Sequence, residues 1–281
     1  MAGIAVQRLA LRSGITLRAL TAGPADAPSI VLLHGWGVSS YLWRHNILPL
    51  AAAGYRVTSL DLPGHGASDA PGSAGAYTLD RFVEHLEAAF DALGITRTAL
   101  AAQSMAGKVA LELARRSPAR IRSLLLFGPV GFGLIPPWRA LAPLVPLLPG
   151  SVPSLLVPRR VVELVQHRVY GKLGWFSARD VDEYWAPTQN PDVVRAQLQM
   201  LKEFDWSPWE LAALMDCSVP TQVVFGTRDR TVRPTHAAPL AAALPQGRLT
   251  WIQDGGHVVM EEVPERTNAL ILGALAGVPL D

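Results

Sequence analysis

Three polar residues that together could cleave an acyl bond occur in the chain in the order serine, aspartate, histidine. Ser104, Asp229 and His257 each follow a short apolar run of the kind that forms a buried strand. A serine hydroxyl is a weak nucleophile at neutral pH, so it needs a base within hydrogen-bonding reach and an acid that orients the base. The residue types and their order therefore predict nucleophilic catalysis by Ser104, with His257 as the base and Asp229 as the acid.

The apolar runs alternate with helical patterns, and this alternation predicts the sheet that positions the three residues. Two alternating segments at 6–12 and 15–21 indicate a β-hairpin, and the apolar run at 29–35, which stops at a glycine, is typical of a strand covered on both faces. Side chains that follow parallel strands meet at the carboxyl edge of the sheet, so the three residues are expected to lie together. Further strands are expected at 29–35, 55–64, 98–103, 121–128, 221–226 and 248–253, and helices at 40–53, 79–93, 105–117, 234–244 and 264–276.

The segment 129–215 interrupts the alternation and indicates a helical insertion over the sheet. It has eight prolines between Pro129 and Pro158, carries five of the eight tryptophans, and shows no strand pattern. We therefore expect a core domain made of residues 1–128 and 216–281, with 129–215 as a helical cap.

Five motifs, taken in order, resemble those of the α/β-hydrolase fold family, in particular its serine-nucleophile, esterase-like members with a helical cap. HGWG at 34–37 is similar to the oxyanion loop of the family, and AQSMAG at 102–107 to its nucleophile elbow. The other motifs are DLPGHGASD at 61–69, GTRDRTV at 226–232, which resembles the acid loop, and GGHVVMEEVPE at 255–265, which resembles the histidine loop. The resemblance implies an α/β fold with a mostly parallel eight-stranded sheet flanked by helices and a cap inserted after the sixth strand.

The resemblance also implies a role for each residue of the site. Ser104 would attack a carbonyl carbon, and His257 would take the serine proton and pass it to the leaving group. Asp229 would hold the imidazole in the required tautomer. The backbone N–H groups of Trp36 and Met105 would form the oxyanion hole, where the loss of one donor typically costs about 3–4 kcal/mol of transition-state stabilisation.

The elbow motif departs from the family pattern, because Ala102 and Ala106 stand where glycines are more common. Small residues are needed there since the strand and the helix approach closely, and alanine adds only one methyl group at each position. Gly107 provides further room. We therefore expect a tight turn with Ser104 at an unfavourable backbone angle, whereas an ordinary helix cap at Ser104 would argue against catalysis.

Several other polar residues near these motifs have competing interpretations. Asp254 is close to Asp229 in the expected fold and is a second candidate for the acid. Asp61, His65 and Asp69 are predicted to be structural, with His65 as a hydrogen-bonding residue of its loop. The remaining histidines show no metal-ligand spacing, and no glycine motif for nucleotides occurs, so neither a metal nor a cofactor is expected.

The aromatic residues of the cap predict the class of substrate. In the family, caps shape the substrate pocket, and Trp138, Trp175 and Trp185 are candidates for its lining. Apolar surface of this kind favours a lipophilic acyl or alcohol group. The predicted reaction is the hydrolysis of a carboxylic ester, or a related acyl bond, of a small-to-medium lipophilic molecule through an acyl-enzyme.

Two alternatives remain open. Some relatives hydrolyse carbon–carbon bonds of aromatic ring-cleavage products, but they commonly carry asparagine before the nucleophile and tryptophan after the histidine, where this chain has Gln103 and Val258. The second alternative is a non-catalytic ligand-binding or accessory protein with the same fold. Relatives with an aspartate nucleophile, the epoxide hydrolases and dehalogenases, do not fit a serine at position 104.

The composition argues against nucleic acid as a partner and against stable insertion into a membrane, while contact of the proline-rich apolar cap with a membrane surface remains open. The net charge is +2, the charged residues are dispersed, and no basic stripe indicates nucleic acid binding. The longest uncharged run, 140–157, contains four prolines, so we expect no membrane-spanning helix and no stable membrane insertion. Cys217 is the single cysteine, so no internal disulfide forms, and the first residues lack a signal-peptide pattern. A cytoplasmic location is expected, and the sequence carries no signal for an oligomeric state.

Overall fold

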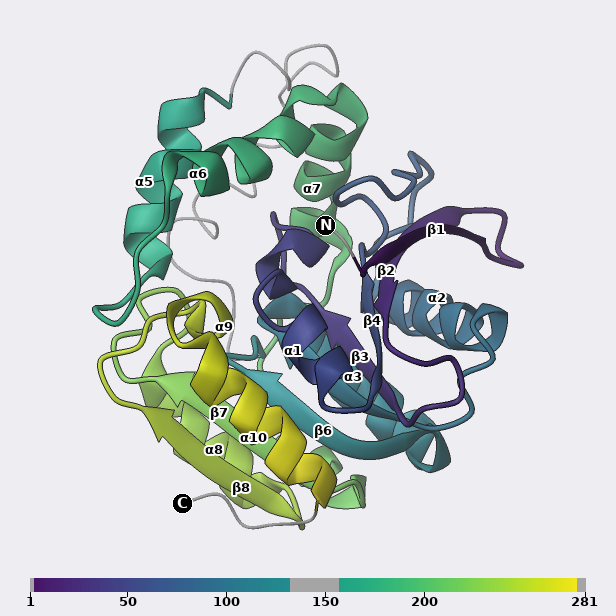
Figure 1. Ribbon diagram of the computed structural model, residues 1–281, viewed down its shortest axis with the longest axis vertical. Helices are drawn as coiled ribbons and strands as arrows, with labels where there is room; N and C mark the ends of the chain where they lie inside the picture. The colour runs from purple at the N-terminus through teal and green to yellow at the C-terminus, as the bar shows by residue number, and fades with distance from the viewer. Residues whose placement is uncertain (1–2, 132–156, 277–281) are drawn as a thin grey trace.

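An eight-stranded β-sheet runs through the centre of the protein, in a computed structural model that describes residues 3–131 and 157–276 (Figure 1). The strands are β1 (Ala5–Ala10), β2 (Thr16–Ala22), β3 (Ser29–Leu33), β4 (Arg56–Leu60), β5 (Thr98–Gln103), β6 (Ile121–Phe127), β7 (Thr221–Gly226) and β8 (Gly247–Ile252). Their order in the sheet is β1-β2-β4-β3-β5-β6-β7-β8. The β1–β2 and β2–β4 pairs are antiparallel and the other pairs are parallel, so the predicted fold class is confirmed.

Helices cover both faces of this sheet and form a further group between β6 and β7. The α-helices of the described residues are α1 (Ile47–Ala52), α2 (Leu79–Ala92), α3 (Met105–Arg116), α5 (Arg159–Val169), α6 (Ala178–Trp185), α7 (Pro191–Glu203), α8 (Ala237–Ala243), α9 (Val259–Glu262) and α10 (Pro264–Ala276). Short 3-10 turns occur at η1 (Ser40–Trp43), η2 (Pro118–Arg120), η5 (Ala186–Gln189), η6 (Leu211–Asp216) and η7 (Pro234–His236).

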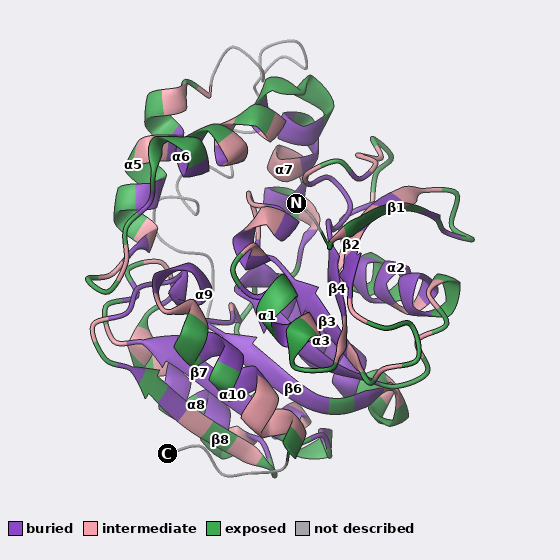
Figure 2. Cartoon of the chain, viewed as in Figure 1, coloured by how far each residue is buried: buried purple, intermediate pink, exposed green. Residues whose placement is uncertain are grey.

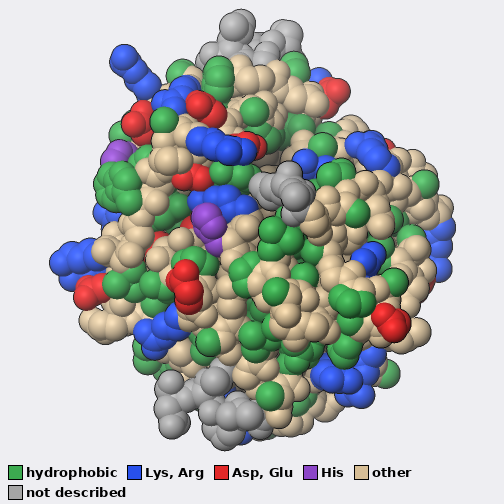
Figure 3. Space-filling model, viewed as in Figure 1, with side chains coloured by type: hydrophobic (Ala, Val, Ile, Leu, Met, Phe, Trp, Pro, Cys, Tyr) green, Lys and Arg blue, Asp and Glu red, His purple; other side chains and the backbone are tan. Residues whose placement is uncertain are grey.

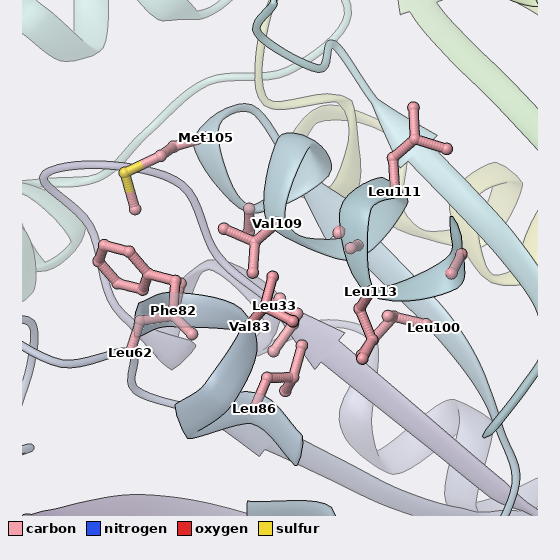
Figure 4. Packing of buried hydrophobic residues seen from close by; sticks show 14 of the residues in the cluster. Leu33, Leu62, Phe82, Val83, Leu86, Leu100, Met105, Val109, Leu111 and Leu113 are labelled. Atoms are coloured by element: carbon pink, nitrogen blue, oxygen red, sulfur yellow. The ribbon is translucent and has the colours of Figure 1, made fainter. Parts of the chain in front are cut away.

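Alternate residues of the strands point into two hydrophobic cores. In β3, Val31 and Leu33 belong to the core under α2, α3 and α8, and Ile30 and Leu32 belong to the core under α1 and α10. Figure 4 shows the first core, in which Leu33 lies among side chains from α2 and α3. Figure 2 shows the central strands buried along their length. Burial on both faces accounts for the continuous apolar run of β3, because neither face meets water.

Helix α2 illustrates how local sequence sets the ends of these elements. The hydroxyl of Thr78 accepts a hydrogen bond from the backbone N–H of Arg81 at 3.3 Å and caps the first turn. Phe82, with other apolar residues at helical spacing, faces the sheet. The helix ends before Gly94, whose positive φ of 66° favours glycine.

The helix predicted over 40–53 is wrong in its extent, since the structure has η1 and α1 as two separate elements. The break falls next to Asn46, which is fully buried. Its side-chain nitrogen Nδ2 donates to Oδ1 of Asn268 in α10 at 2.8 Å. Pro49 disfavours a helix that continues through residue 45, because its ring would clash with that residue's carbonyl and it has no N–H to donate. The Asn46–Asn268 bond lies at the turn that results.

Helices α5, α6 and α7 form the cap, and they lie apart from the helices that cover the sheet (Figure 1). Several polar contacts join the α7 end of the cap to the core, among them those of Trp36 and Lys108. The indole Nε1 of Trp36 donates to the carbonyl of Gln197 in α7 at 3.1 Å. Lys108, buried in α3, forms an ion pair with Asp205 at 2.9 Å and donates to the carbonyl of Ser207 at 3.0 Å.

The surface carries charges of both signs, and on the face drawn in Figure 3 neither sign forms a continuous stripe. Within the described residues no helix is long and apolar enough to cross a membrane. Apart from Val157, the uncharged run at 140–157 lies outside the described residues.

The loop after β4 is built on the buried carboxylate of Asp61. This carboxylate accepts hydrogen bonds from Nε of Arg18 at 2.6 Å and from the backbone N–H groups of Ser40 and Ala67 at 2.8 and 2.9 Å. These bonds join strand β2, turn η1 and the loop at one point. The positions of Asp61 and its partners fit the structural role predicted from the sequence.

His65 occupies the same loop and is fully buried. Its Nδ1 lies 3.0 Å from the carbonyl of Pro63, so Nδ1 carries the proton, and its Nε2 has no partner among the described residues. Its ring meets that of His34 edge-on at 4.9 Å. Burial lowers the pKa of His65 to about 3, because a charged imidazolium has no solvation there.

Acid should therefore destabilise the protein through His65. The unfolded chain takes up a proton near the ordinary pKa of 6.5 and the folded chain does not until about 3, so stability falls as the pH drops between these values. We expect His65→Asn to reduce the slope of unfolding free energy against pH in this range by about 1.4 kcal/mol per pH unit. Urea unfolding at a series of pH values measures the slope. Above about pH 7 the slopes of the two proteins should coincide, and equal slopes in acid would contradict the assignment.

Candidate active site

Ser104 forms a sharp turn between β5 and α3. Its φ of 54° and ψ of −117° lie in a region that residues other than glycine seldom adopt. Its side chain accepts no hydrogen bond from the first turn of α3, so Ser104 is not an ordinary helix cap. The backbone N–H of Ser104 donates to Phe127 O at 2.9 Å, and that of Val130 donates to Ser104 O at 3.1 Å. The unfavourable backbone angle expected at Ser104 is confirmed.

The turn at Ser104 is packed on all sides by small residues. Ala102 and Ala106 are fully buried. A Cβ atom on Gly35 would lie 2.3 Å from Oε1 of Gln103 and 2.8 Å from Cβ of Ser104. A Cβ atom on Gly107 would lie 2.6 Å from Cβ of Pro129. Glycine is therefore required at 35 and 107, while alanine is accommodated at 102 and 106.

His257 and Asp229 form a buried pair. Nδ1 of His257 lies 2.7 Å from Oδ2 of Asp229, and both side chains are almost completely buried. Oδ1 of the same carboxylate accepts the backbone N–H groups of Thr231 and Val232 at 2.7 and 2.8 Å. Because these bonds orient the carboxylate toward Nδ1, the imidazole carries its proton there and leaves Nε2 as the basic nitrogen.

The elbow and the histidine loop are in contact. Nε2 of Gln103, the residue before Ser104, donates to the carbonyl of His257 at 3.4 Å. A Cβ atom on Gly128, at the end of β6, would lie 3.0 Å from Oδ2 of Asp229 and 3.1 Å from Nδ1 of His257. In the described part of the chain, no hydrogen bond joins the Ser104 hydroxyl to the His257 ring. Such a bond is often longer in the unliganded state of an enzyme.

Asp254, the alternative acid, points elsewhere. Its carboxylate pairs with Arg228 at the surface and makes no hydrogen bond to His257 among the described residues. The Arg228 guanidinium lowers the pKa of this carboxyl. Of the two candidates, Asp229 is the one that the structure places beside His257.

The two residues predicted to form the oxyanion hole flank Ser104. Met105 is the first residue of α3, so its N–H has no acceptor within the helix and lies at the positive end of the helix dipole. Trp36 follows Gly35, whose Cα packs against the Ser104 side chain. The loop that carries Trp36 and the first residue of α3 thus both adjoin Ser104.

The three tryptophans predicted to line the substrate pocket have different surroundings. Trp175 is 71% exposed and stacks on Phe176 with ring centroids 5.1 Å apart. Trp185 is half-buried and its indole Nε1 donates to the carbonyl of Val157 at 3.0 Å. Trp138 lies outside the described residues. No hydrogen bond or ring contact joins Trp175 or Trp185 to Ser104, Asp229 or His257 within the described ranges.

A buried polar cluster beside the histidine loop was not found by the sequence analysis. The carboxylate of Glu261 accepts hydrogen bonds from Arg44 and from the hydroxyls of Tyr170 and Tyr184. Arg44 also pairs with Asp180 at 2.9 Å. Burial raises the pKa of the Glu261 carboxyl, and the adjacent Arg44 guanidinium opposes that shift. No short motif connects these residues, because Arg44 and Glu261 are far apart in the sequence.

Comparison with known proteins assigns the chain to a family. The family model described as alpha/beta hydrolase fold matches residues 28–264. The chain is 32% identical over 270 residues to a pimeloyl-[acyl-carrier protein] methyl ester esterase of Aromatoleum aromaticum, covering 90% of this chain and 100% of that protein. It is 31% identical over 265 residues to a magnesium-chelatase 30 kDa subunit of Rhodobacter capsulatus, covering 91% and 89% of the two chains.

A solved structure agrees with this assignment at the level of the fold. The 2-hydroxy-6-oxo-6-phenylhexa-2,4-dienoate hydrolase of Rhodococcus superposes with a TM-score of 0.81 and 22% sequence identity, over 97% of this chain and 99% of that one. With the strand order, the serine turn and the family match taken together, the chain belongs to the α/β hydrolase fold family.

Proposed function

We propose that the chain is a serine hydrolase that cleaves a carboxylic ester of a small-to-medium lipophilic molecule through an acyl-enzyme on Ser104. The observation that carries this proposal is the turn at Ser104, which holds a non-glycine residue at positive φ and leaves its hydroxyl uninvolved in capping α3. Such backbone strain is retained only where the surrounding structure enforces it, and it is typical of catalytic residues. The buried His257–Asp229 pair next to this turn supplies the base that a serine nucleophile needs.

The proposed reaction proceeds in two halves. In the first, Nε2 of His257 removes the Ser104 proton as Oγ bonds to the ester carbonyl carbon, and the imidazolium then gives this proton to the departing alcohol. In the second half, His257 removes a proton from water, whose oxygen attacks the acyl-enzyme. The acid is released and the proton returns to Ser104. Asp229 accepts Nδ1–H throughout and stabilises the transient imidazolium.

The negative charge that develops on the carbonyl oxygen needs donors in a fixed position. The N–H of Met105 lies at the N-terminus of the 12-residue helix α3, where the unsatisfied amides and the helix dipole favour an anion. The N–H of Trp36 is the second proposed donor. The indole of Trp36 is hydrogen-bonded to Gln197 of the cap, and this contact supports a fixed position for the loop that carries the donor.

The ester specificity draws support from a relative. The similar protein from Aromatoleum aromaticum is named a methyl ester esterase and matches along its whole length. A serine at the nucleophile position supports acyl transfer, which would form an ester on Ser104. Carbon–carbon bond hydrolysis is the second candidate reaction, because the chain shares its fold with the 2-hydroxy-6-oxo-6-phenylhexa-2,4-dienoate hydrolase of Rhodococcus.

Replacement of the nucleophile tests the proposal directly. We expect a fluorophosphonate probe to label the wild-type chain and not Ser104→Ala, because the probe bonds to an activated serine oxygen. On a panel of p-nitrophenyl esters of increasing chain length, Ser104→Ala should lower kcat by roughly 10⁴-fold to 10⁶-fold. Ser73→Ala, at an exposed serine, is the matched control and should label normally.

Three outcomes of this experiment would count against the ester proposal. Labelling that persists in Ser104→Ala would refute the nucleophile. A 2-hydroxy-6-oxo-dienoate is assayed beside the esters, and its turnover in preference to every ester would favour the carbon–carbon bond hydrolase. Labelling without turnover of any substrate in the panel would favour a ligand-binding protein.

Replacing the carboxylate of Asp229 by an amide tests its role as the acid. Asp229→Asn keeps the shape of the side chain but stabilises the wrong imidazole tautomer, so kcat should fall by about 10⁴-fold. Asp254→Asn is the matched control and should change kcat by no more than about twofold, since surface substitutions have small effects. The measurement is initial-rate kinetics on the best ester of the panel. A larger loss in the control than in Asp229→Asn would reverse the assignment of the acid.

A further inference from the structure

The loop that carries His257 is hydrogen-bonded to the cap through its backbone. The N–H of His257 donates to the carbonyl of Val169 at 2.7 Å, and the N–H of Lys172 donates to the carbonyl of Asp254 at 2.8 Å. Val169 ends α5 and Lys172 belongs to the segment that follows it. The proposed general base is therefore held at its own amide by a residue of the cap.

This backbone contact depends on glycines on both sides. A Cβ atom on Gly171 would lie 2.4 Å from Asp254 O and Gly256 N, and one on Gly256 would lie 2.3 Å from Gly171 N. Neither Gly171 nor Gly256 has a positive φ, so the backbone conformation does not require glycine at either position. Their role is to let the cap segment and the histidine loop approach to backbone distance.

The carboxylate of Glu262 bridges the same two segments. Its Oε1 accepts the N–H of Gly256 at 2.7 Å, and its Oε2 accepts the N–H of Gly171 at 2.8 Å. Gly256 immediately precedes His257. A carboxylate offers an acceptor on both oxygens, whereas the amide of glutamine would turn an NH₂ group toward one of the two N–H donors. A glutamine at 262 therefore cannot hold both segments.

The neighbouring carboxylate of Glu261 holds the cap from a second direction. Through Arg44 it connects to the core after the 34–37 loop, and through the hydroxyls of Tyr170 and Tyr184 it connects to the end of α5 and to α6. The loop of Asp229 joins the same cap segment, since Arg230 donates to the carbonyl of Tyr170 at 3.1 Å. Both catalytic loops are thus attached to the residues that follow α5.

We propose that Glu262 and Gly171 are positioning residues for His257. They clamp the cap segment 169–172 onto the histidine loop, and Glu261 anchors the cap. As a result, the cap and the general base move together. This inference rests on the proposed function, in which His257 must reach the Ser104 hydroxyl. A substrate whose binding moves the cap then also changes the position of Nε2 of His257 relative to Ser104. A misplacement of about 1 Å can cost about 100-fold in rate.

Two substitutions test the clamp, one in the core and one in the cap, and each has a matched control. Glu262→Gln removes one acceptor, and Gly171→Ala forces the cap segment away from the histidine loop. The controls are Glu265→Gln, at an exposed glutamate of α10, and Gly72→Ala, where a Cβ atom meets nothing within 4 Å. Each variant is assayed for kcat and KM on the best ester, for the rate of fluorophosphonate labelling, for thermal unfolding, and for the downfield proton resonance of the His257–Asp229 hydrogen bond.

We expect both clamp variants to lower kcat and the labelling rate by about 10-fold to 100-fold with KM within about threefold of wild type. The His257–Asp229 resonance should shift or broaden in both, and the controls should match wild type. Tyr184→Phe removes one of the hydroxyl groups that donate to Glu261, so it should lower kcat less than the two clamp variants do. It replaces Gly171→Ala in the experiment if that variant does not fold.

Two results would overturn the clamp. One is a kcat in both clamp variants that stays within about twofold of wild type. The other is a loss of kcat that matches the loss of folded protein in the clamp variants, with an unchanged His257–Asp229 resonance. This result would show that the two residues act on stability alone. If the wild-type chain neither labels nor hydrolyses any ester, the proposed function fails, and the resonance in the clamp variants and their controls still decides whether the clamp holds His257.

Discussion

The backbone turn at Ser104 is the constraint on which the rest of the site depends. A residue at positive φ costs of the order of 1–3 kcal/mol, so the surroundings must enforce it. Here the enforcement comes from the hydrogen bonds to Phe127 and Val130 and from the close packing of Gly35 and Gly107. The same closeness brings the 34–37 loop, the end of β6 and the start of α3 to one point. A loosening at any of these places would relax the turn.

Buried charges organise the loops around this turn. Asp61 joins β2, η1 and its own loop through Arg18 and two backbone amides, and Glu261 joins the core to the cap through Arg44 and two tyrosines. In both places each carboxylate oxygen has partners, which offsets the cost of removing the charge from water. Loss of one partner would leave the other charge buried and unpaired, and this makes the loops sensitive to single substitutions.

The sequence predicts the sheet well, and it predicts the strand ends at which the proposed triad lies, because these signals are local. The parallel strands are mostly apolar, and Ser104, Asp229 and His257 each follow one of them at the carboxyl edge. The helix expected over 40–53 is interrupted before Pro49, whose ring would clash with the carbonyl of residue 45 in a continuous helix. The hydrogen bond from Asn46 to Asn268 at the turn joins residues more than two hundred positions apart, so it has no local signal. The cluster around Glu261 was missed for the same reason, since nothing near Arg44 or Tyr184 in the chain indicates a shared partner.

The close backbone approach of Gly171 and Gly256 also affects whether the cap can be exchanged for another. A cap built as an independent module would be exchangeable between relatives, so that a new specificity follows from a new insertion. Here the insertion contributes a hydrogen-bond acceptor to the backbone of His257, and the core contributes a carboxylate to the backbone of Gly171. A transplanted cap would have to present a glycine and a free carbonyl at these positions. A residue larger than glycine at position 171 would break this backbone contact, so an exchanged cap is constrained at the segment that follows α5.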